Sequence, residues 1–220
     1  MPFKVNIKKI SLAITLPLLF LTSCEVGRTT STIAGNSEDN IGGGAEVVYL
    51  FDNGTDVFGN LSAVNPVTPT GPGRSYADNG CQSQYDSMAA TWDISCNHVK
   101  AVLSFAGDSI KDMPSNQDVP ADVSVETIDG GVMANDWDDF MDGFNGIPSG
   151  TGFSGYSSGT FWTGSDSDGD TDAANNCTDF SVGSSGNAQY MDSTLSLAPW
   201  SIGTDSCGNT RPYLCICWDE

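Results

Sequence analysis

The cysteines constrain the fold of this chain more than any other feature. Seven occur in 220 residues, and one of them, Cys24, directly follows an N-terminal apolar run. The other six are Cys81, Cys96, Cys177, Cys207, Cys215 and Cys217. In an exported chain an even set of cysteines is typical of a disulfide framework. A thiolate zinc site is disfavoured, because the chain has no CxxC motif and only one histidine.

The N-terminal segment has the organisation of a bacterial lipoprotein signal. Lysines precede an apolar run over residues 10–21, which is shorter than the roughly 20 residues that a helix needs to cross a bilayer. The run ends in Leu21-Thr22-Ser23-Cys24. This resembles the lipobox, whose cysteine is acylated, with palmitate among the acyl chains, and becomes residue one after cleavage. We therefore predict a signal peptide over residues 1–23 and a lipid anchor at Cys24; an ordinary secretory signal is the alternative.

The mature chain is strongly acidic. The sequence has 8 basic and 28 acidic residues, a net charge of -20. Removal of the three lysines in the signal peptide leaves 5 basic residues against the same 28 acidic ones, which gives -23. Such a surface repels nucleic acid, anionic lipid and sulfated glycans. Cationic partners, calcium and neutral sugars remain compatible with it.

Composition divides the mature chain into a tether and one domain. Residues 24–45 are rich in Ser, Thr, Gly and Asn and have too few apolar residues to form a core, so we predict a flexible tether. The first strand signal is Glu46-Val47-Val48-Tyr49-Leu50-Phe51, and the domain is expected over residues 46–220. Its 16% charged residues and 25 glycines argue against a coiled coil or a helical bundle.

Local patterns predict a mixture of helices, strands and long loops. Apolar spacing predicts a helix over residues 74–88 that carries Cys81, and a second helix over residues 133–141 that Asn135 or Asp136 would cap. Other expected features are strands over residues 161–163 and 212–218, a compact apolar segment over residues 99–105 and a glycine-rich loop over residues 143–159.

The order of these signals resembles a C-type lectin-like domain over residues 46–220. The features that match are a helix with a cysteine, the core motif Trp162-Thr163-Gly164, and then Cys177, Trp200, Cys207 and Tyr213-Leu214-Cys215. Segments 48–61, 134–143 and 161–177 are also similar to an endostatin-like domain of uncharacterised bacterial lipoproteins of the leptospiral type. The resemblance implies an α+β fold with a small antiparallel sheet, two helices and long loops. A proline-rich insertion between Asn60 and Gln82 and an extra cysteine pair depart from the family pattern.

The same resemblance implies disulfide pairings. Cys177 and Cys207 match the family's loop clamp, and Cys81 and Cys215 match its long bridge. Cys217 lies two residues beyond Cys215, so both side chains point to one face of a strand and the strand can receive Cys81 and Cys96 together. We predict Cys177 with Cys207, and leave open the order in which Cys81 and Cys96 join Cys215 and Cys217.

Residues 165–172 are the strongest candidate for a metal site. Aspartates alternate around Gly169 and offer the carboxylate oxygens that calcium prefers; they are Asp166, Asp168, Asp170 and Asp172. The segment is not an EF-hand, because Thr171 and Cys177 replace the required Gly and Glu. Calcium is therefore a possible cofactor, and a solvated acidic loop is the alternative.

Other residues that carry chemistry give weaker signals. The tripeptides that C-type lectins use for sugar binding are absent. His98 has no neighbouring nucleophile or metal-ligand motif, so we expect no enzyme activity from it. The tryptophans are expected in the core; they are Trp92, Trp137, Trp162, Trp200 and Trp218.

Together these observations predict a lipid-anchored protein of the cell envelope, in an outer membrane, with a ligand-binding domain. We expect an adhesin or protein-binding lipoprotein whose partner is a host or cell-surface protein. A calcium-dependent glycan-binding module is the alternative, and a hydrolase or a purely structural envelope protein is less favoured. The contacts are expected from loops over residues 143–159, 165–176 and 190–205.

Overall fold

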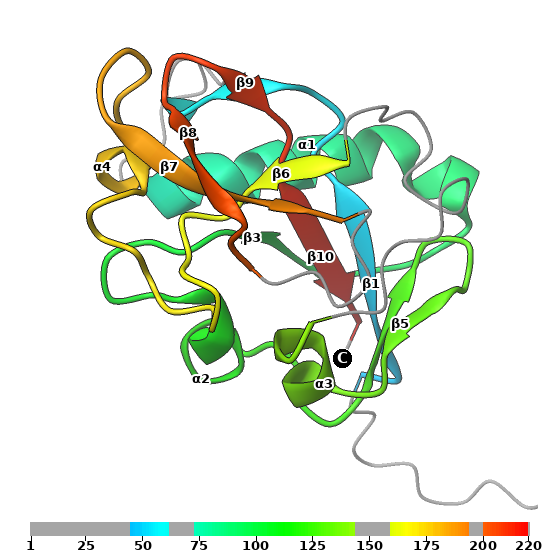
Figure 1. Ribbon diagram of the computed structural model, residues 1–220. Helices are drawn as coiled ribbons and strands as arrows, with labels where there is room; N and C mark the ends of the chain where they lie inside the picture. The colour runs from blue at the N-terminus through cyan, green and yellow to red at the C-terminus, as the bar shows by residue number, and fades with distance from the viewer. Residues whose placement is uncertain (1–44, 62–72, 144–158, 194–199, 220) are drawn as a thin grey trace, which may run out of the picture. The chain divides into compact units, whose positions relative to one another are not determined.

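The computed structural model describes residues 45–61, 73–143, 159–193 and 200–219 (Figure 1). The predicted signal peptide, Cys24 and all of the predicted tether except Ala45 lie outside these residues. Within the described part, no helix is both long and apolar enough to cross a membrane.

The central element is a five-stranded sheet in the order β3-β10-β1-β4-β5. Its strands are β3 (His98–Val102), β10 (Leu214–Trp218), β1 (Val47–Asp52), β4 (Ser124–Thr127) and β5 (Val132–Ala134). The prediction of an antiparallel sheet is wrong for one pair, because β1 and β4 run parallel. The chain makes that parallel pairing after a long crossover that contains α1 and β3.

The remaining strands form two smaller sheets. One has the order β6-β7-β8, formed by β6 (Thr160–Trp162), β7 (Asn187–Asp192) and β8 (Gly203–Ser206). The other pairs β2 (Val57–Phe58) with β9 (Thr210–Arg211). The strands expected over residues 161–163 and 212–218 are thus confirmed as β6 and β10, and the apolar segment 99–105 contributes most of β3.

The helix predicted around Cys81 is confirmed as α1 (Gly73–Trp92). The other helical segments are short: the 3-10 turn η2 (Ile110–Asp112), α2 (Met113–Gln117), α3 (Trp137–Met141) and α4 (Cys177–Phe180). The residues of α4 have positive φ, so α4 is a left-handed turn. In Figure 1 α1 crosses behind β10 and β1.

The second predicted helix, over residues 133–141, is wrong at its start. Met133 and Ala134 belong to β5, where Ala134 pairs with Val125, and both side chains are buried in the core. The helix begins at Trp137, because the Asp136 side chain accepts a hydrogen bond from the Asp139 N–H and caps it. The helical spacing of the apolar residues therefore spans two elements that both face the core.

The core lies on both faces of the five-stranded sheet, and β10 is buried along its whole length. Leu214, Ile216 and Trp218 pack on the side of α2 and α3, whereas Cys215 and Cys217 face the side of α1. The tryptophans are core residues as expected. Trp137, Trp162, Trp200 and Trp218 are buried, and Trp92 packs against Phe51 with 5.2 Å between ring centroids.

Three disulfides join these elements. Cys81 of α1 is bonded to Cys215, and Cys96 to Cys217, so β10 receives both partners on one face. This is the order that the sequence left open. The third disulfide joins Cys177 at α4 to Cys207 after β8. The domain is therefore a mixed α+β fold in which β10, an inner strand of the sheet, is covalently linked to α1.

Candidate functional site

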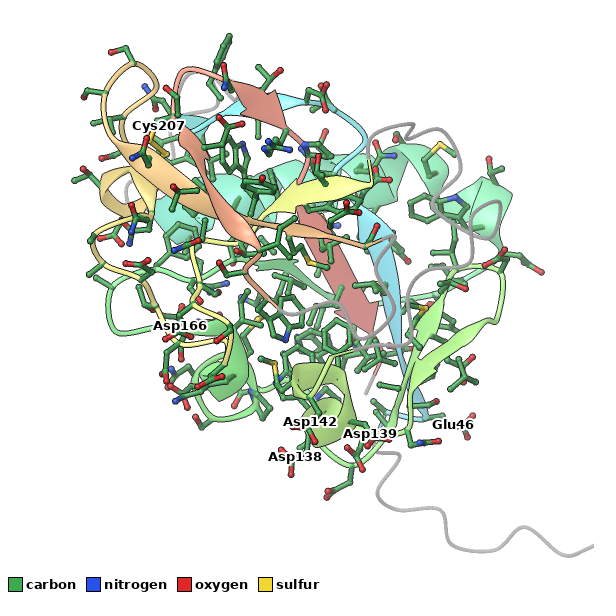
Figure 2. All side chains as sticks on the ribbon, viewed as in Figure 1. Glu46, Asp138, Asp139, Asp142, Asp166 and Cys207 are labelled. Atoms are coloured by element: carbon green, nitrogen blue, oxygen red, sulfur yellow. A yellow bond between two sulfur atoms is a disulfide. The ribbon has the colours of Figure 1, made fainter. Side chains whose placement is uncertain are left out.

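The acidic loop over residues 165–172 is folded by its own hydrogen bonds. One carboxylate oxygen of Asp166 accepts from the backbone N–H groups of Asp168 and Asp170, each at 3.0 Å. The Thr171 hydroxyl donates to the Phe105 carbonyl at 2.7 Å, which ties the loop to the chain after β3. Figure 2 places Asp166 at the surface near α2. The loop thus has a defined conformation with Asp166 at its centre.

Two of the four candidate calcium ligands bind side chains outside the loop. Asp170 forms an ion pair with Lys111 at 2.5 Å, and this hydrogen bond raises the pKa of the lysine. Asp172 accepts from the side-chain amides of Gln189 at 2.6 Å and Asn175 at 2.9 Å. Burial acts to raise the pKa of Asp172, but these hydrogen bonds outweigh it and the pKa is lowered.

The structure does not bring the carboxylates of the loop into a cluster. Among the described residues, no group of three or more His, Cys, Asp or Glu side chains is placed to hold a metal ion. Calcium binding by Asp166, Asp168, Asp170 and Asp172 stays a prediction, and in this conformation the loop packs by hydrogen bonding.

His98 lies in a structural environment. It starts β3, pairs in register with Trp218 and stacks on the indole ring with 5.1 Å between centroids and 11° between ring planes. The two rings cover the end of the five-stranded sheet. Nothing about this contact gives His98 a substrate-facing position.

The three loops expected to bind a ligand differ in how far the structure describes them. Residues 144–158 and 194–199 lie outside the described residues. The segment 190–205 is not a single loop, because its ends belong to β7 and β8. The acidic loop is the one that the structure describes throughout.

The basic side chains of the described domain are all engaged. Each forms an ion pair with aspartate: Arg74 with Asp78 and Asp108, Lys100 with Asp78, Lys111 with Asp170 and Arg211 with Asp205. The unpaired charge on this part of the chain is therefore carried by carboxylates. Several of these project into solvent in Figure 2, including Asp138 and Asp139 of α3 and Asp142, which follows the helix.

Arg74 holds the start of α1 against β3. Its guanidinium donates to the carbonyls of Ala101 at 3.0 Å and Leu103 at 2.6 Å. Asp78, one turn further along α1, accepts from the Ala101 N–H at 2.9 Å. Burial raises the pKa of Asp78, and the positive charge of Arg74 acts in the opposite direction. This cluster fixes the helix and has no open face for a ligand.

A cavity of about 290 Å³ lies between α1, the turn that follows β1, and the residue before β10. Its lining residues are Asn53, Gly54, Thr55, Val57, Leu61, Tyr76, Gly80, Ser83, Gln84 and Tyr213. At this size it approaches the lower limit of small-molecule sites, which is about 300 Å³. Unlike the acidic loop, it is a concave space lined by several elements.

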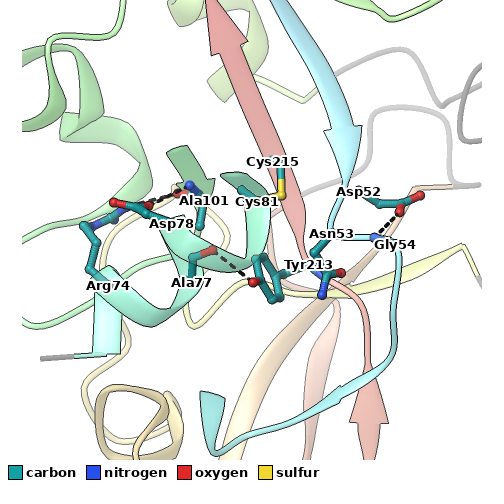
Figure 3. The surroundings of a disulfide bond; sticks show 10 residues. All are labelled: Asp52, Asn53, Gly54, Arg74, Ala77, Asp78, Cys81, Ala101, Tyr213 and Cys215. Carbon is teal, nitrogen blue, oxygen red and sulfur yellow. Dashed lines mark hydrogen bonds and ion pairs between the residues drawn. A yellow bond between two sulfur atoms is a disulfide. The ribbon is translucent and has the colours of Figure 1, made fainter. Parts of the chain in front are cut away.

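Tyr213 and Asn53 form one wall of this cavity. The Asn53 N–H donates to the Tyr213 carbonyl, and the Asn53 side-chain oxygen accepts from the Tyr213 N–H, both at 3.1 Å. The Tyr213 hydroxyl donates to the Ala77 carbonyl at 3.0 Å, a contact that Figure 3 shows beside the Cys81–Cys215 disulfide. Burial raises the pKa of that hydroxyl, so it stays protonated as a donor.

Asp52 lies next to this wall. Burial raises its pKa to about 6, although one carboxylate oxygen accepts from the Gly54 N–H at 2.7 Å (Figure 3). Asp52 is not part of the described lining of the cavity, which contains no charged side chain.

The residues that line this cavity carry no common motif in the sequence. Asn53 and Gly54 follow the first predicted strand, Gly80 lies inside the helix predicted over residues 74–88, and Tyr213 lies in the predicted terminal strand. They meet only because β1 pairs with β10 and α1 is bonded to β10. The feature visible in the sequence is Gly80 inside a helical pattern, because a residue without a side chain permits another residue to approach the helix closely.

No family model matches the chain, and no curated protein matches it.

Proposed function

We propose that the chain is a lipid-anchored protein of the cell envelope whose domain binds a basic protein partner, as an adhesin or protein-binding lipoprotein does. Anchoring would use the lipobox cysteine, Cys24. The three disulfides suit an oxidising compartment outside the cytoplasm. The domain would then act at the envelope, in an outer membrane.

One observation carries the proposal for a basic partner. Arg74, Lys100, Lys111 and Arg211 are each neutralised by an aspartate, so the described domain offers a partner only unpaired negative charge. The whole chain has a net charge of -20. A field of this sign speeds association with basic surfaces and opposes acidic ones.

We further propose that the fold is C-type lectin-like. In its support, a helical cysteine joins the last strand of the sheet through Cys81 and Cys215, and Trp162-Thr163-Gly164 lies in the core next to that strand. Cys177 and Cys207 tie the loop region as that resemblance implies. The parallel pairing of β1 with β4 departs from the antiparallel sheet that the resemblance implies.

Binding is tested with the full chain in lipid nanodiscs of neutral phospholipid, against a panel of proteins with isoelectric points above about 9. We expect at least one to bind, and its affinity to fall about tenfold or more between 50 and 500 mM salt, because salt screens exposed charges. Asp138→Asn with Asp142→Asn should weaken binding, since both side chains are exposed, the first on α3 and the second directly after it. A panel without a binder, or one whose binding ignores salt, overturns the proposal.

Localisation is tested separately on intact cells. Protease treatment should remove the domain from cells that make the natural chain, and Cys24→Ala should release the protein from the membrane fraction. Full protection from protease in intact cells contradicts a role at the cell surface, whereas retention of the Cys24→Ala chain in the membrane contradicts the lipid anchor.

A further inference from the structure

The cavity between α1 and β1 is held in shape before any ligand arrives. Gly80 and Cys81 are adjacent on α1. The Cys81–Cys215 disulfide fixes this turn of the helix to Cys215, which lies two residues after Tyr213 in the sequence. The paired hydrogen bonds between Asn53 and Tyr213 fix the opposite wall. A site with rigid walls loses little conformational entropy when a ligand binds.

Two glycines permit these walls to approach one another. A Cβ atom at Gly80 would clash with the Tyr213 hydroxyl oxygen. Gly54 has φ of +71°, and a Cβ atom there would clash with the side-chain amide of Gln84. Both positions thus bring a polar side chain close to backbone at the edge of the cavity.

The lining combines groups that suit an uncharged, hydroxyl-rich ligand. Amides and hydroxyls can donate and accept hydrogen bonds, and here they come from Asn53, Thr55, Tyr76, Ser83 and Gln84. Tyrosine rings and the apolar side chains of Val57 and Leu61 can cover the C–H faces of a sugar ring. An anionic ligand is disfavoured because the described lining has no cation and the chain is strongly acidic.

We propose that this cavity binds a neutral saccharide, one ring in size, without calcium. The site is separate from the acidic loop, which is positioned by Lys111, Gln189 and Phe105 rather than by α1. It is also independent of the proposed capture of a basic protein, which depends on exposed carboxylates. The ligand enters past Ser83, which is exposed on α1.

The test uses the full chain in zwitterionic-detergent micelles with EDTA, so that no glycoside detergent competes. The probes are the methyl glycosides of glucose, galactose, mannose and N-acetylglucosamine, screened by saturation-transfer NMR and then titrated. We expect at least one to bind with a millimolar or lower Kd. Ser83→Trp should weaken that binding by about tenfold or more by filling the entrance, and Gln84→Ala by about threefold or more through loss of an amide.

Gln82→Ala is the matched control, because Gln82 lies on the same helix but is exposed and donates to Asp86 at 2.8 Å. It should leave the Kd unchanged, and the melting temperatures of all three variants should stay near that of the natural chain. The proposal is overturned by a panel that gives no signal, by binding that Ser83→Trp leaves intact, or by binding that EDTA abolishes. None of these results bears on the capture of basic proteins.

Discussion

Two regions of the domain use aspartate in opposite ways. The first, which we call the stapled region, comprises α1 and the five-stranded sheet; here burial raises the pKa of Asp52 and Asp78. The second, the loop region, comprises β6, β7, β8 and the acidic loop. There burial also acts to raise the pKa of Asp172 and Asp205, but hydrogen bonds from neighbouring side chains outweigh it and lower the pKa.

The difference shows what holds each region together. The stapled region is stabilised by apolar packing and by two disulfides that span 134 and 121 residues of sequence. Its buried carboxylates are destabilised in their charged form by the loss of hydration. The loop region has one disulfide spanning 30 residues, and its carboxylates organise the backbone around them. Covalent and apolar forces therefore dominate in the first region, and local hydrogen bonds in the second.

The largest effect is expected from the two disulfides of the stapled region. With Cys96–Cys217 intact, Cys81–Cys215 closes a loop of only about 17 residues, so losing it alone should cost about 3 kcal/mol of unfolding free energy. Losing both should cost about 8 kcal/mol, since a loop of more than about 100 residues then opens as well.

This prediction is checked by denaturant unfolding of Cys81→Ala/Cys215→Ala, of Cys96→Ala/Cys217→Ala and of the combined variant. The combined loss should exceed the sum of the two separate losses. Cys177→Ala/Cys207→Ala is the control from the loop region and should not show this coupling. Simple additivity would mean that the two bonds do not share a loop in the unfolded chain.

Arg74 gives the next largest effect. Arg74→Ala should lower the unfolding free energy by about 3–5 kcal/mol, because it leaves buried carboxylates without their cation and removes donors from two backbone carbonyls. Arg74→Lys keeps the charge but not the planar guanidinium group. Its unfolding free energy should lie between those of the natural chain and of Arg74→Ala. Thermal melts of the three chains measure this; equal melting temperatures for Arg74→Ala and the natural chain would show that the cluster contributes little.

Asp52 should make the stapled region less stable as the pH rises. Its pKa of about 6 in the folded chain exceeds the ordinary value of 3.8, so the unfolded chain loses the proton first. The contribution of Asp52 to the unfolding free energy is fully present below pH 4 and is lost as the pH rises through 6. Asp52→Asn should therefore raise the unfolding free energy by about 1–2 kcal/mol at pH 8 and change it little at pH 4. An equal effect at both pH values contradicts this assignment.

Asp172→Asn is the counterpart from the loop region, with the opposite sign. The lowered pKa of Asp172 means that its stabilisation is present above pH 4 and is lost as the pH falls below that value. Replacing the carboxylate removes an acceptor for Gln189 and Asn175, and should cost about 1 kcal/mol at pH 7. Chemical denaturation between pH 2 and 8 separates the two profiles, and matching profiles would remove the contrast between the regions.

The smallest effect concerns calcium at the acidic loop. Lys111 competes for Asp170, so Lys111→Met should strengthen calcium binding by about threefold. Calorimetric titration of the natural chain, of Lys111→Met and of Lys111→Met with Asp168→Ala measures this, and the last variant should lose the gain. An absence of heat in all three removes calcium from the loop and leaves hydrogen bonding as its role.

The sequence predicts the individual helices and strands of this domain better than the contacts between them. The helix with Cys81 and the strands β1, β6 and β10 follow from apolar spacing and β-branched runs. The pattern over residues 133–141 misleads, because a strand and a helix that both face the core can share one helical spacing. Parallel pairing of β1 with β4 depends on a crossover of more than 70 residues, which no local signal specifies.

The candidate sites differ in the same way. Alternating aspartates are visible in the sequence, but whether they converge on an ion depends on partners such as Lys111 and Gln189, which lie far away in the chain. The cavity has no sequence motif, because its walls come from segments around residues 54, 80 and 213. Its recognition requires the tertiary structure.

The position of β10 sets the order in which the domain can assemble. This strand lies inside the sheet, between β3 and β1, yet it follows every other described strand along the chain. A polypeptide that emerges with its N-terminal end first must hold β1 and β3 apart until β10 arrives. The five-stranded sheet therefore receives its full set of strands only after this segment has left the ribosome.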